Sequence, residues 1–170
     1  EKNDMSRREF SKRSAATVAA AGAITGPFFS RKVLGANDQV NLAHIGIRGQ
    51  GFGHIKGFGK IPGVKIRTIC DVDENLFPER VSFIEKEFGY KPKTEWDMRE
   101  VFADKDIDAV TFATPNHWHA LGAIWAAQAK KHVYVEKPCG HNPREGEILV
   151  EAQKKYNKVV QMGNQQRSSG

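Results

Sequence analysis

Glycines cluster at the end of an apolar run, residues 40–47, which is the first predicted strand of the chain. Where residues lack a Cβ atom, backbone N–H groups can approach the pyrophosphate of a dinucleotide closely, and the positive end of a following helix adds to the attraction. A glycine cluster also suits an ordinary turn, but its place after a buried strand favours a dinucleotide site. The residues predicted to bind a pyrophosphate are Gly49, Gln50, Gly51, Phe52 and Gly53.

A carboxylate, Asp71, follows the second apolar run, residues 64–69. It lies 22 residues after Gly49, close to the spacing of an acid that accepts hydrogen bonds from ribose hydroxyls. Its charge would repel the 2′-phosphate of NADP, so NAD is the expected cofactor. The alternative is that Asp71 caps the next helix, although Asp73 is better placed for that. A G-x-G-x-x-G pattern has its third glycine position at His54, so we expect the helix to start differently.

Two more polar segments follow apolar runs, which places them at the carboxyl ends of strands, where open α/β sheets bind ligands. Thr114, Asn116 and His119 belong to the first segment, and Glu136 and Lys137 to the second. An alternative role for His119 is that of a helix-start histidine whose ring bonds to the backbone. For Lys137 the alternative is a solvated surface lysine. Its position between an acid and a proline at a strand end favours a role in the site.

Neither a metal site nor a disulfide is expected. His117 and His119 would diverge by about 200° on a helix, and no further cluster of ligands is visible. Cys70 and Cys139 lie near the ends of strands that should be about three strand spacings apart, on the order of 14 Å. Bridged Cα atoms lie within roughly 7 Å, so two free thiols are predicted.

Short, β-branched-rich apolar runs alternate with helical patterns along the chain. The predicted strands are residues 40–47, 64–69, 109–113, 132–135 and 159–162. Helix signals are the row Val81, Ile84 and Phe88, the capping box of Asp97 and Glu100, and the cap Asn142, Pro143 and Glu145 of a helix running to about Tyr156. Such alternation predicts an α/β fold with a doubly wound parallel sheet, the Rossmann fold.

These motifs together resemble the Gfo/Idh/MocA oxidoreductase family over about residues 38–167. The most specific element is Glu136-Lys137-Pro138 after a Thr-Pro-Asn-His segment. The resemblance implies an N-terminal Rossmann domain that binds NAD(P), followed by a C-terminal α/β domain that binds a sugar or polyol. It also implies that the lysine is catalytic and lies beside the nicotinamide and the substrate hydroxyl.

By the same resemblance, Asn116 and His119 would line the cofactor and Glu136 would help to hold that wall. Arg48 stands where exported relatives often have glycine. The chain stops at Gly170, so the substrate domain, with the family's usual catalytic histidine, is expected to be missing. An oligomer is expected only with that domain.

The function expected is therefore NAD binding in a sugar or polyol oxidoreductase, with hydride transfer between a hydroxyl carbon and NAD. One alternative is an NAD-dependent glycosidase that acts by transient oxidation. Another is a non-catalytic nucleotide-binding fragment.

The basic charge of the chain is concentrated at its N-terminus. Of the net charge of +6, residues 1–36 carry +4 and the rest +2. Because no basic stripe with interleaved aromatic residues is present, a nucleic-acid partner is not expected. Arg7, Arg8 and Phe10 have the spacing of a twin-arginine export signal, and a modest apolar run ending in small residues follows. A basic amphipathic or disordered tail is the alternative.

We therefore predict a twin-arginine signal peptide over residues 1–36 and a Rossmann domain over residues 37–170. The expected partner for export is the twin-arginine machinery, and the expected location is the periplasm, with NAD tightly bound. The apolar run is too short for a stable membrane anchor.

Overall fold

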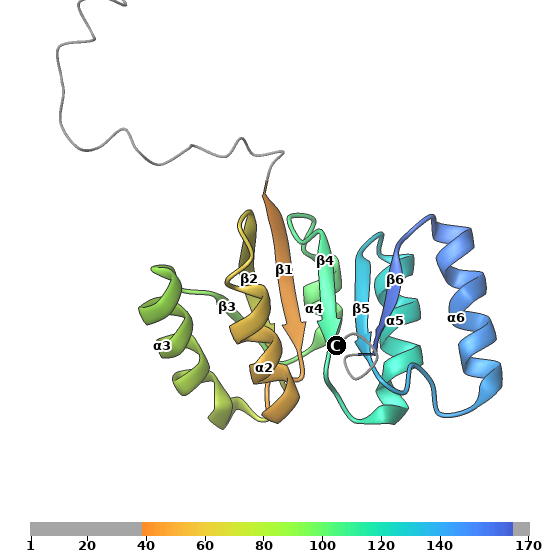
Figure 1. Cartoon of the computed structure of the whole chain (residues 1–170), viewed down its shortest axis with the longest axis horizontal. Helices are drawn as coiled ribbons and strands as arrows, with labels where there is room; N and C mark the ends of the chain where they lie inside the picture. The colour runs from red at the N-terminus through yellow and green to blue at the C-terminus, as the bar shows by residue number, and fades with distance from the viewer. Residues whose placement is uncertain (1–38, 165–170) are drawn as a thin grey trace, which may run out of the picture. The chain divides into compact units, whose positions relative to one another are not determined.

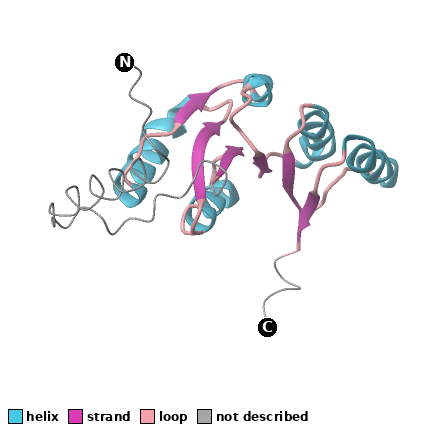
Figure 2. Ribbon diagram, turned by 90° about the horizontal axis from the view of Figure 1, so that it is seen from above, coloured by secondary structure: helices cyan, strands magenta, loops and turns pink. Residues whose placement is uncertain are grey.

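The computed structural model describes residues 39–164, which form a six-stranded sheet with helices on both sides (Figure 1, Figure 2). The strands are β1 (Val40–Ile45), β2 (Val64–Cys70), β3 (Lys93–Glu95), β4 (Ala109–Phe112), β5 (His132–Glu136) and β6 (Val160–Gly163). All neighbouring pairs are parallel, in the order β3-β2-β1-β4-β5-β6. This is the strand order of a dinucleotide-binding Rossmann sheet, so the predicted fold class is confirmed.

The helices follow from this strand order. They are α2 (Gly49–Phe58), α3 (Phe77–Phe88), α4 (Met98–Ala103), α5 (His119–Gln128) and α6 (Pro143–Tyr156), with short 3₁₀ turns η2 (Glu74–Leu76) and η3 (Asn116–Trp118). Parallel crossovers are almost always right-handed. The chain moves from β1 to β2 and β3 in one direction, then to β4, β5 and β6 in the other. The helices of the two halves therefore cover opposite faces.

Two clusters of buried apolar side chains match these two faces. One joins α4, α5 and α6 to the sheet and includes Val101, Phe112, Ala123 and Leu149. The other joins α2 and α3 to the sheet, with Ile55 and Ile84 fully buried. Because the central strands are covered on both sides, they read as apolar runs without alternation.

The five predicted strands are all present, and the sequence missed a sixth. β3 consists of only Lys93, Thr94 and Glu95. It pairs with β2 at the edge of the sheet, and two of its residues are exposed. A short polar edge strand leaves no apolar run to detect.

Asn142 and Asp97 are confirmed as helix caps. The capping box predicted for Asp97 and Glu100 is not confirmed, because Asp97 bonds to the N–H of Arg99. Asn142 Oδ1 accepts a hydrogen bond from the backbone N–H of Glu145 at 3.0 Å, and α6 ends at Tyr156. Asp97 caps α4 by accepting from the N–H of Arg99 at 2.9 Å. These side chains satisfy N–H groups that the first turn of a helix leaves without partners.

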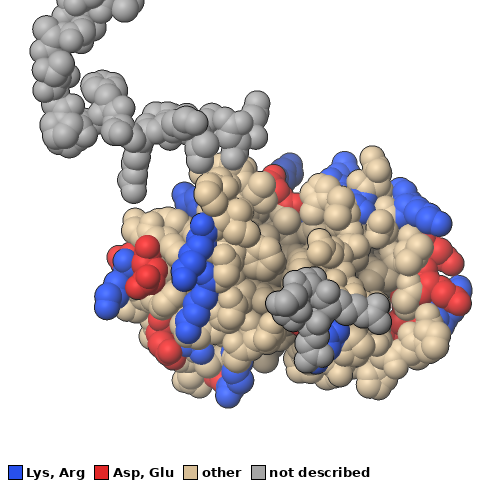
Figure 3. Space-filling view, in the orientation of Figure 1, with Lys and Arg blue, Asp and Glu red and all other residues tan. Residues whose placement is uncertain are grey.

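Several other predictions can be placed on the fold. Cys70 and Cys139 are both free, as predicted. Within residues 39–164, no helix is long and apolar enough to cross a membrane. On the face drawn in Figure 3, basic and acidic side chains are interspersed rather than gathered into one basic field. The proposed signal peptide over residues 1–36 lies outside the described residues.

Candidate functional site

The turn between β1 and α2 contains two glycines whose positions exclude a side chain. Gly46 has a φ of 80°, and a Cβ atom there would lie 2.8 Å from the backbone of Ala113. A Cβ atom at Gly51 would lie 1.8 Å from the carbonyl oxygen of Gly46. The first and third glycines of a G-x-G-x-x-G turn make such close approaches. Gly46 and Gly51 therefore fill those two positions, and Arg48 occupies the second.

The glycine pattern thus begins earlier than the sequence suggested. Starting it at Gly49 placed the third position at His54, which is wrong, because Arg48 interrupts the glycines and disguises the frame. α2 itself begins at Gly49, which has a φ of 28°. A Cβ atom at Gly53 would meet nothing within 4 Å, so that position has room for a side chain.

The other two predicted turn residues, Gln50 and Phe52, direct their side chains to neighbouring elements. Gln50 Nε2 donates to Glu136 Oε1 at 3.2 Å. The Phe52 ring packs edge-on against Phe83, with centroids 5.0 Å apart, and lies 3.9 Å from the Arg80 guanidinium. What these two residues would offer a pyrophosphate is therefore their backbone N–H groups, and that contact stays a prediction.

Asp71 ties the end of β2 to the glycine turn. Its Oδ2 accepts from the backbone N–H of Ile47 at 2.8 Å, and its Oδ1 accepts from the N–H of Asp73 at 3.0 Å. Each carboxylate oxygen has a second lone pair, so it can still accept from a ribose hydroxyl. The helix cap at this point is Asp73, which bonds to the N–H of Asn75 and begins η2. The preference for Asp73 as the cap is confirmed.

A pocket of about 740 Å³ opens at the carboxyl ends of the strands, beside the switch point between β1 and β4. It is lined by Ile45, Gly46, Arg48, Cys70, Asp71, Val72, Asp73, Trp96, Asp97, Met98, Arg99, Ala113, Thr114, Pro115, Trp118 and Trp125. Open α/β sheets bind ligands at this place. Of the predicted site residues, Asp71 and Thr114 line the pocket.

Two pocket residues show which chemistry the wall can supply. Thr114 Oγ1 is buried and has no hydrogen-bond partner within the described part of the chain. A buried hydroxyl of this kind is a ready partner for a bound polar ligand. Burial, followed by the charges of Asp71, Asp97 and Glu95, raises the pKa of the Cys70 thiol to about 12. The thiol is therefore neutral and is no candidate nucleophile.

His119 links the two loops that follow β4 and β5. The residue is 1% exposed. Its Nε2 faces the carbonyl oxygen of Thr114 at 2.8 Å, and its Nδ1 faces that of Pro138 at 2.6 Å. A neutral ring donates to one of these carbonyls and a cationic ring to both. The structure supports the alternative of a backbone-bonded histidine, and direct contact with a cofactor stays a prediction.

Glu136 is held by a buried contact with α2. Its Oε1 lies 2.7 Å from His54 Nε2, and both side chains are almost fully buried. The next ring inward is His44, whose Nδ1 lies 2.6 Å from Thr111 Oγ1. Burial, with a smaller contribution from His54, lowers the pKa of His44 to about 3. His54 thus links α2 to β5. This contact was not predicted from the sequence, where His54 was considered only as the third position of the glycine pattern.

Lys137 and Asn116 lie at the same edge of the sheet, and both are exposed. Phe112 of β4 pairs with Val135 of β5 in parallel register. Thr114 and Lys137 each follow this pair by two residues. Lys137 therefore lies one strand over from the pocket and is not among its lining residues.

The pocket also contains residues that sequence reasoning did not select: Arg48, Trp96 and Trp118. Trp118 belongs to the polar segment after β4 that was selected from the sequence, so its place in the site could have been predicted. Trp96 directly follows β3, the strand that the sequence did not reveal. Without that strand, nothing placed Trp96 at the carboxyl edge.

The residues present fit a dinucleotide. The first turn of α2 has no acidic residue and no side-chain cap. Its backbone N–H groups can therefore donate to a pyrophosphate without competition from a carboxylate of the helix. The glycines allow close approach, Asp71 offers acceptors for a ribose, and Thr114 contributes a hydroxyl.

Comparison with protein families and curated relatives agrees with this site. The family model described as "Oxidoreductase family, NAD-binding Rossmann fold" (Gfo/Idh/MocA) matches residues 40–164. A glycosyl hydrolase family 109 protein of Shewanella pealeana is 34% identical over 117 residues, which are 66% of this chain and 26% of that protein. A protein of the same name from Shewanella woodyi is 31% identical over 72% of this chain and 27% of its own length. The chain spans about a quarter of the length of these relatives.

Solved structures give the same result. Scyllo-inositol dehydrogenase from Lactobacillus casei, with bound NAD(H) and scyllo-inositol, superposes with a TM-score of 0.67 and 25% identity. Myo-inositol 2-dehydrogenase from Lactobacillus plantarum gives 0.66 and 26%. Each match covers 77% of this chain and 38% of the other. The chain therefore belongs to the NAD-binding Gfo/Idh/MocA oxidoreductase family, and its sheet is that family's Rossmann fold.

Proposed function

We propose that this chain is the NAD-binding part of an enzyme that oxidises a hydroxyl carbon of a sugar or polyol. The observation that carries the proposal is the pocket at the carboxyl edge, where the glycine turn, Asp71 and Thr114 meet one strand away from Lys137. Family membership supports it, as does the likeness to a scyllo-inositol dehydrogenase solved with NAD(H) and scyllo-inositol.

Within this proposal each residue has a distinct task. NAD, when bound, supplies the hydride acceptor. The glycine turn and α2 hold the pyrophosphate, and Asp71 accepts from the adenosine ribose. Lys137 receives or relays the proton of the substrate hydroxyl, as a positioned general base does. Glu136, fixed by His54, keeps the Lys137 segment in place relative to α2.

A second candidate is cleavage of a glycoside through transient oxidation by NAD. The observation that favours it is that the curated relatives described above are glycosyl hydrolase family 109 proteins. The demands on this chain are the same in both cases, because each requires NAD beside a sugar carbon. What differs is the fate of the substrate, which contacts outside this chain would decide.

We further propose that residues 1–36 are a twin-arginine signal and that the Rossmann domain covers residues 37–170. A substrate-binding α/β domain would supply the sugar contacts and the surface for an oligomer. Because the twin-arginine route carries folded proteins and no external pool of NAD is expected, the cofactor would be held tightly. Fusing residues 1–36 to a reporter, and changing Arg7→Lys with Arg8→Lys, tests export. Export of the double variant at the wild-type level would contradict it.

The central test is binding of NAD to the 170-residue chain by isothermal titration calorimetry, with NADP as the comparison. We expect saturable binding of NAD and weaker binding of NADP, because Asp71 repels a 2′-phosphate. Chain that is folded by circular dichroism but binds neither nucleotide would overturn the proposal. Absorbance of nucleotide released on denaturation of the purified chain measures how tightly the cofactor is held.

A further inference from the structure

Arg48 is the unusual residue of the glycine turn. It occupies the second position of the Gly46–Gly51 frame, where a residue without a side chain normally lets the backbone approach a pyrophosphate. Its backbone is extended, with φ of −79° and ψ of 168°, and it is the N-cap residue of α2. Its side chain is 73% exposed and makes no capping bond to the helix. The guanidinium therefore lies in the pocket lining, free of the helix, between the glycine turn and Asp73.

The guanidinium is held by one carboxylate across the pocket. Arg48 Nη2 pairs with Asp73 Oδ2, and both residues line the pocket. Asp73 has other bonds, since its Oδ1 accepts from the backbone N–H and the side-chain amide of Asn75. The ion pair thus connects the β1–α2 turn to the start of η2, beside Asp71.

The second cation in the pocket lining is bound differently. Arg99 pairs with Asp97 through both Nε and Nη2 on α4, a two-point contact two residues away in sequence. Among residues 39–164, Arg48 has one ion-pair partner, Asp73, which lies on another segment of the chain. An exposed pair of this kind contributes little to stability, so Arg48 can exchange partners more readily than Arg99.

We propose that Arg48 is a ligand of the cofactor's pyrophosphate and that it leaves Asp73 when the cofactor binds. A pyrophosphate is a stronger partner than one exposed carboxylate, because it offers the fork of the guanidinium several anionic oxygens. Asp73 keeps its bonds to Asn75 after the exchange, so η2 retains its cap. This inference rests on the NAD site proposed above and adds a residue to it.

The test uses ADP-ribose, which carries the pyrophosphate, and adenosine, which lacks it. Binding of both to the 170-residue chain is measured by calorimetry and by the fluorescence of the three tryptophans, Trp96, Trp118 and Trp125, all of which line the pocket. Arg48→Gln should weaken ADP-ribose binding about tenfold, the effect of losing one charge-assisted bond, and leave adenosine binding unchanged. Asp73→Asn, which frees Arg48, should tighten ADP-ribose binding by about threefold.

The matched control is Arg144→Gln, which removes an arginine of similar exposure whose ion-pair partner, Glu147, lies on α6 outside the pocket. It should leave both affinities unchanged. Wild-type or tighter ADP-ribose binding by Arg48→Gln would overturn the role of Arg48 while leaving the NAD site intact. An equal loss for ADP-ribose and adenosine would also overturn it. A wild-type chain that binds neither ligand would overturn the NAD site itself.

Discussion

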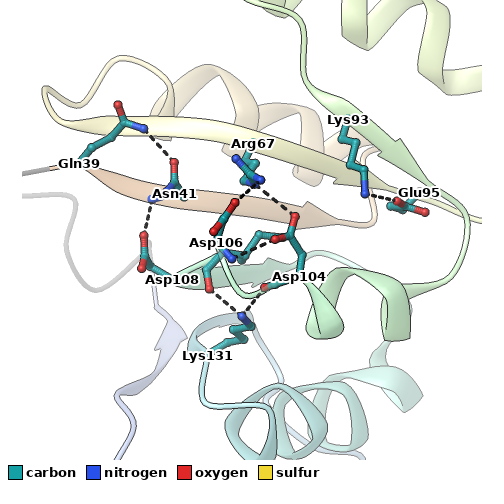
Figure 4. A network of polar contacts seen from close by, with 10 residues as sticks. Gln39, Asn41, Arg67, Lys93, Glu95, Asp104, Asp106, Asp108 and Lys131 are labelled. Atoms are coloured by element: carbon teal, nitrogen blue, oxygen red, sulfur yellow. Dashed lines mark hydrogen bonds and ion pairs between the residues drawn. The ribbon is translucent and has the colours of Figure 1, made fainter. Parts of the chain in front are cut away.

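The sheet has an amino edge, where its strands begin, and a carboxyl edge, where its strands end. These two edges differ in how they use their polar residues. At the amino edge, charges are paired within the protein (Figure 4). Arg67 contacts Asp104 at 3.2 Å and Asp106 at 2.6 Å, and Asp108 accepts from the N–H of Asn41 at 2.8 Å. Buried Lys131 donates to two backbone carbonyls. This network joins β1, β2 and the segment before β4.

At the carboxyl edge some polar groups are paired, such as Arg48 with Asp73 and Glu136 with His54, but others are left open to a ligand. Thr114 Oγ1 has no partner among the described residues, Lys137 is exposed, and the first turn of α2 has no side-chain cap. Glycines replace side chains at the closest approach. The amino edge therefore stabilises the fold. At the carboxyl edge, some polar groups lack hydrogen-bond partners within the described part of the chain, and a ligand would supply them. Changes at the two edges should separate stability from binding.

The largest effect is expected at Lys137. In an enzyme that combines this chain with a substrate domain, Lys137→Ala should lower the rate of the chemical step by about 10²- to 10⁴-fold, because a proton acceptor is lost. Binding of NAD to the chain should change little, since Lys137 does not line the pocket. Single-turnover kinetics and calorimetry measure the two quantities. Unchanged turnover would rule out the catalytic role.

Gly51 and Gly53, the third and fifth residues of α2, form a matched pair. Gly51→Ala should lower the free energy of unfolding by about 3 kcal/mol and abolish NAD binding, because its Cβ would collide with the Gly46 carbonyl. Gly53→Ala meets nothing within 4 Å. It should raise the free energy of unfolding by about 0.5 to 1 kcal/mol, since alanine favours a helix. Equal urea midpoints for the two variants would refute this frame of the motif.

His44, buried near the carboxyl end of β1, should make stability depend on pH. Its pKa is lowered to about 3 in the folded chain, so the stability it contributes is fully present above its ordinary pKa of 6.5 and is lost as the pH falls towards 3. Between pH 8 and pH 5 the loss should be about 2 kcal/mol. His54 and Glu136 are the neighbouring titratable groups. Urea unfolding of wild type and His44→Gln should show a shallower dependence in the variant, and parallel curves would contradict this.

Lys131 tests the amino edge alone. Lys131→Met removes the donor to the carbonyls of Asp104 and Ile107. Leaving these buried acceptors without that donor should cost about 1 to 2 kcal/mol of unfolding free energy. The affinity for NAD should stay at the wild-type value, because the residue lies at the opposite edge. A loss of NAD affinity without a loss of stability would contradict the assignment of stability to the amino edge and of binding to the carboxyl edge.

The last prediction concerns cofactor preference at Asp71 rather than stability. Asp71→Asn removes the charge that repels a 2′-phosphate, so the ratio of NADP to NAD dissociation constants should fall about tenfold. Asp106→Asn, which removes a carboxylate at the amino edge, is the control and should leave the ratio unchanged. Titration of both variants with both nucleotides gives the answer. An unaltered ratio in Asp71→Asn would remove Asp71 from cofactor selection.

Most of the fold could be predicted because its signals are local. Five strands are apolar runs, and Asn142, Asp97 and Asp73 mark helix or turn starts through bonds to N–H groups two or three residues away. β3 escaped because a polar edge strand is defined by its pairing with β2 rather than by its own residues. The place of Trp96 in the pocket was missed for the same reason, because this residue directly follows β3.

The sequence by itself determined the alternation of strands and helices, the glycine turn, and the order of polar segments along the carboxyl edge. Tertiary structure alone decided that Gly46 meets another segment, because a Cβ atom there would lie 2.8 Å from the backbone of Ala113, which follows β4. It also decided that the side chain of His54 contacts that of Glu136, 82 residues away. Contacts between distant segments depend on how the strands are ordered, and no local pattern records that order.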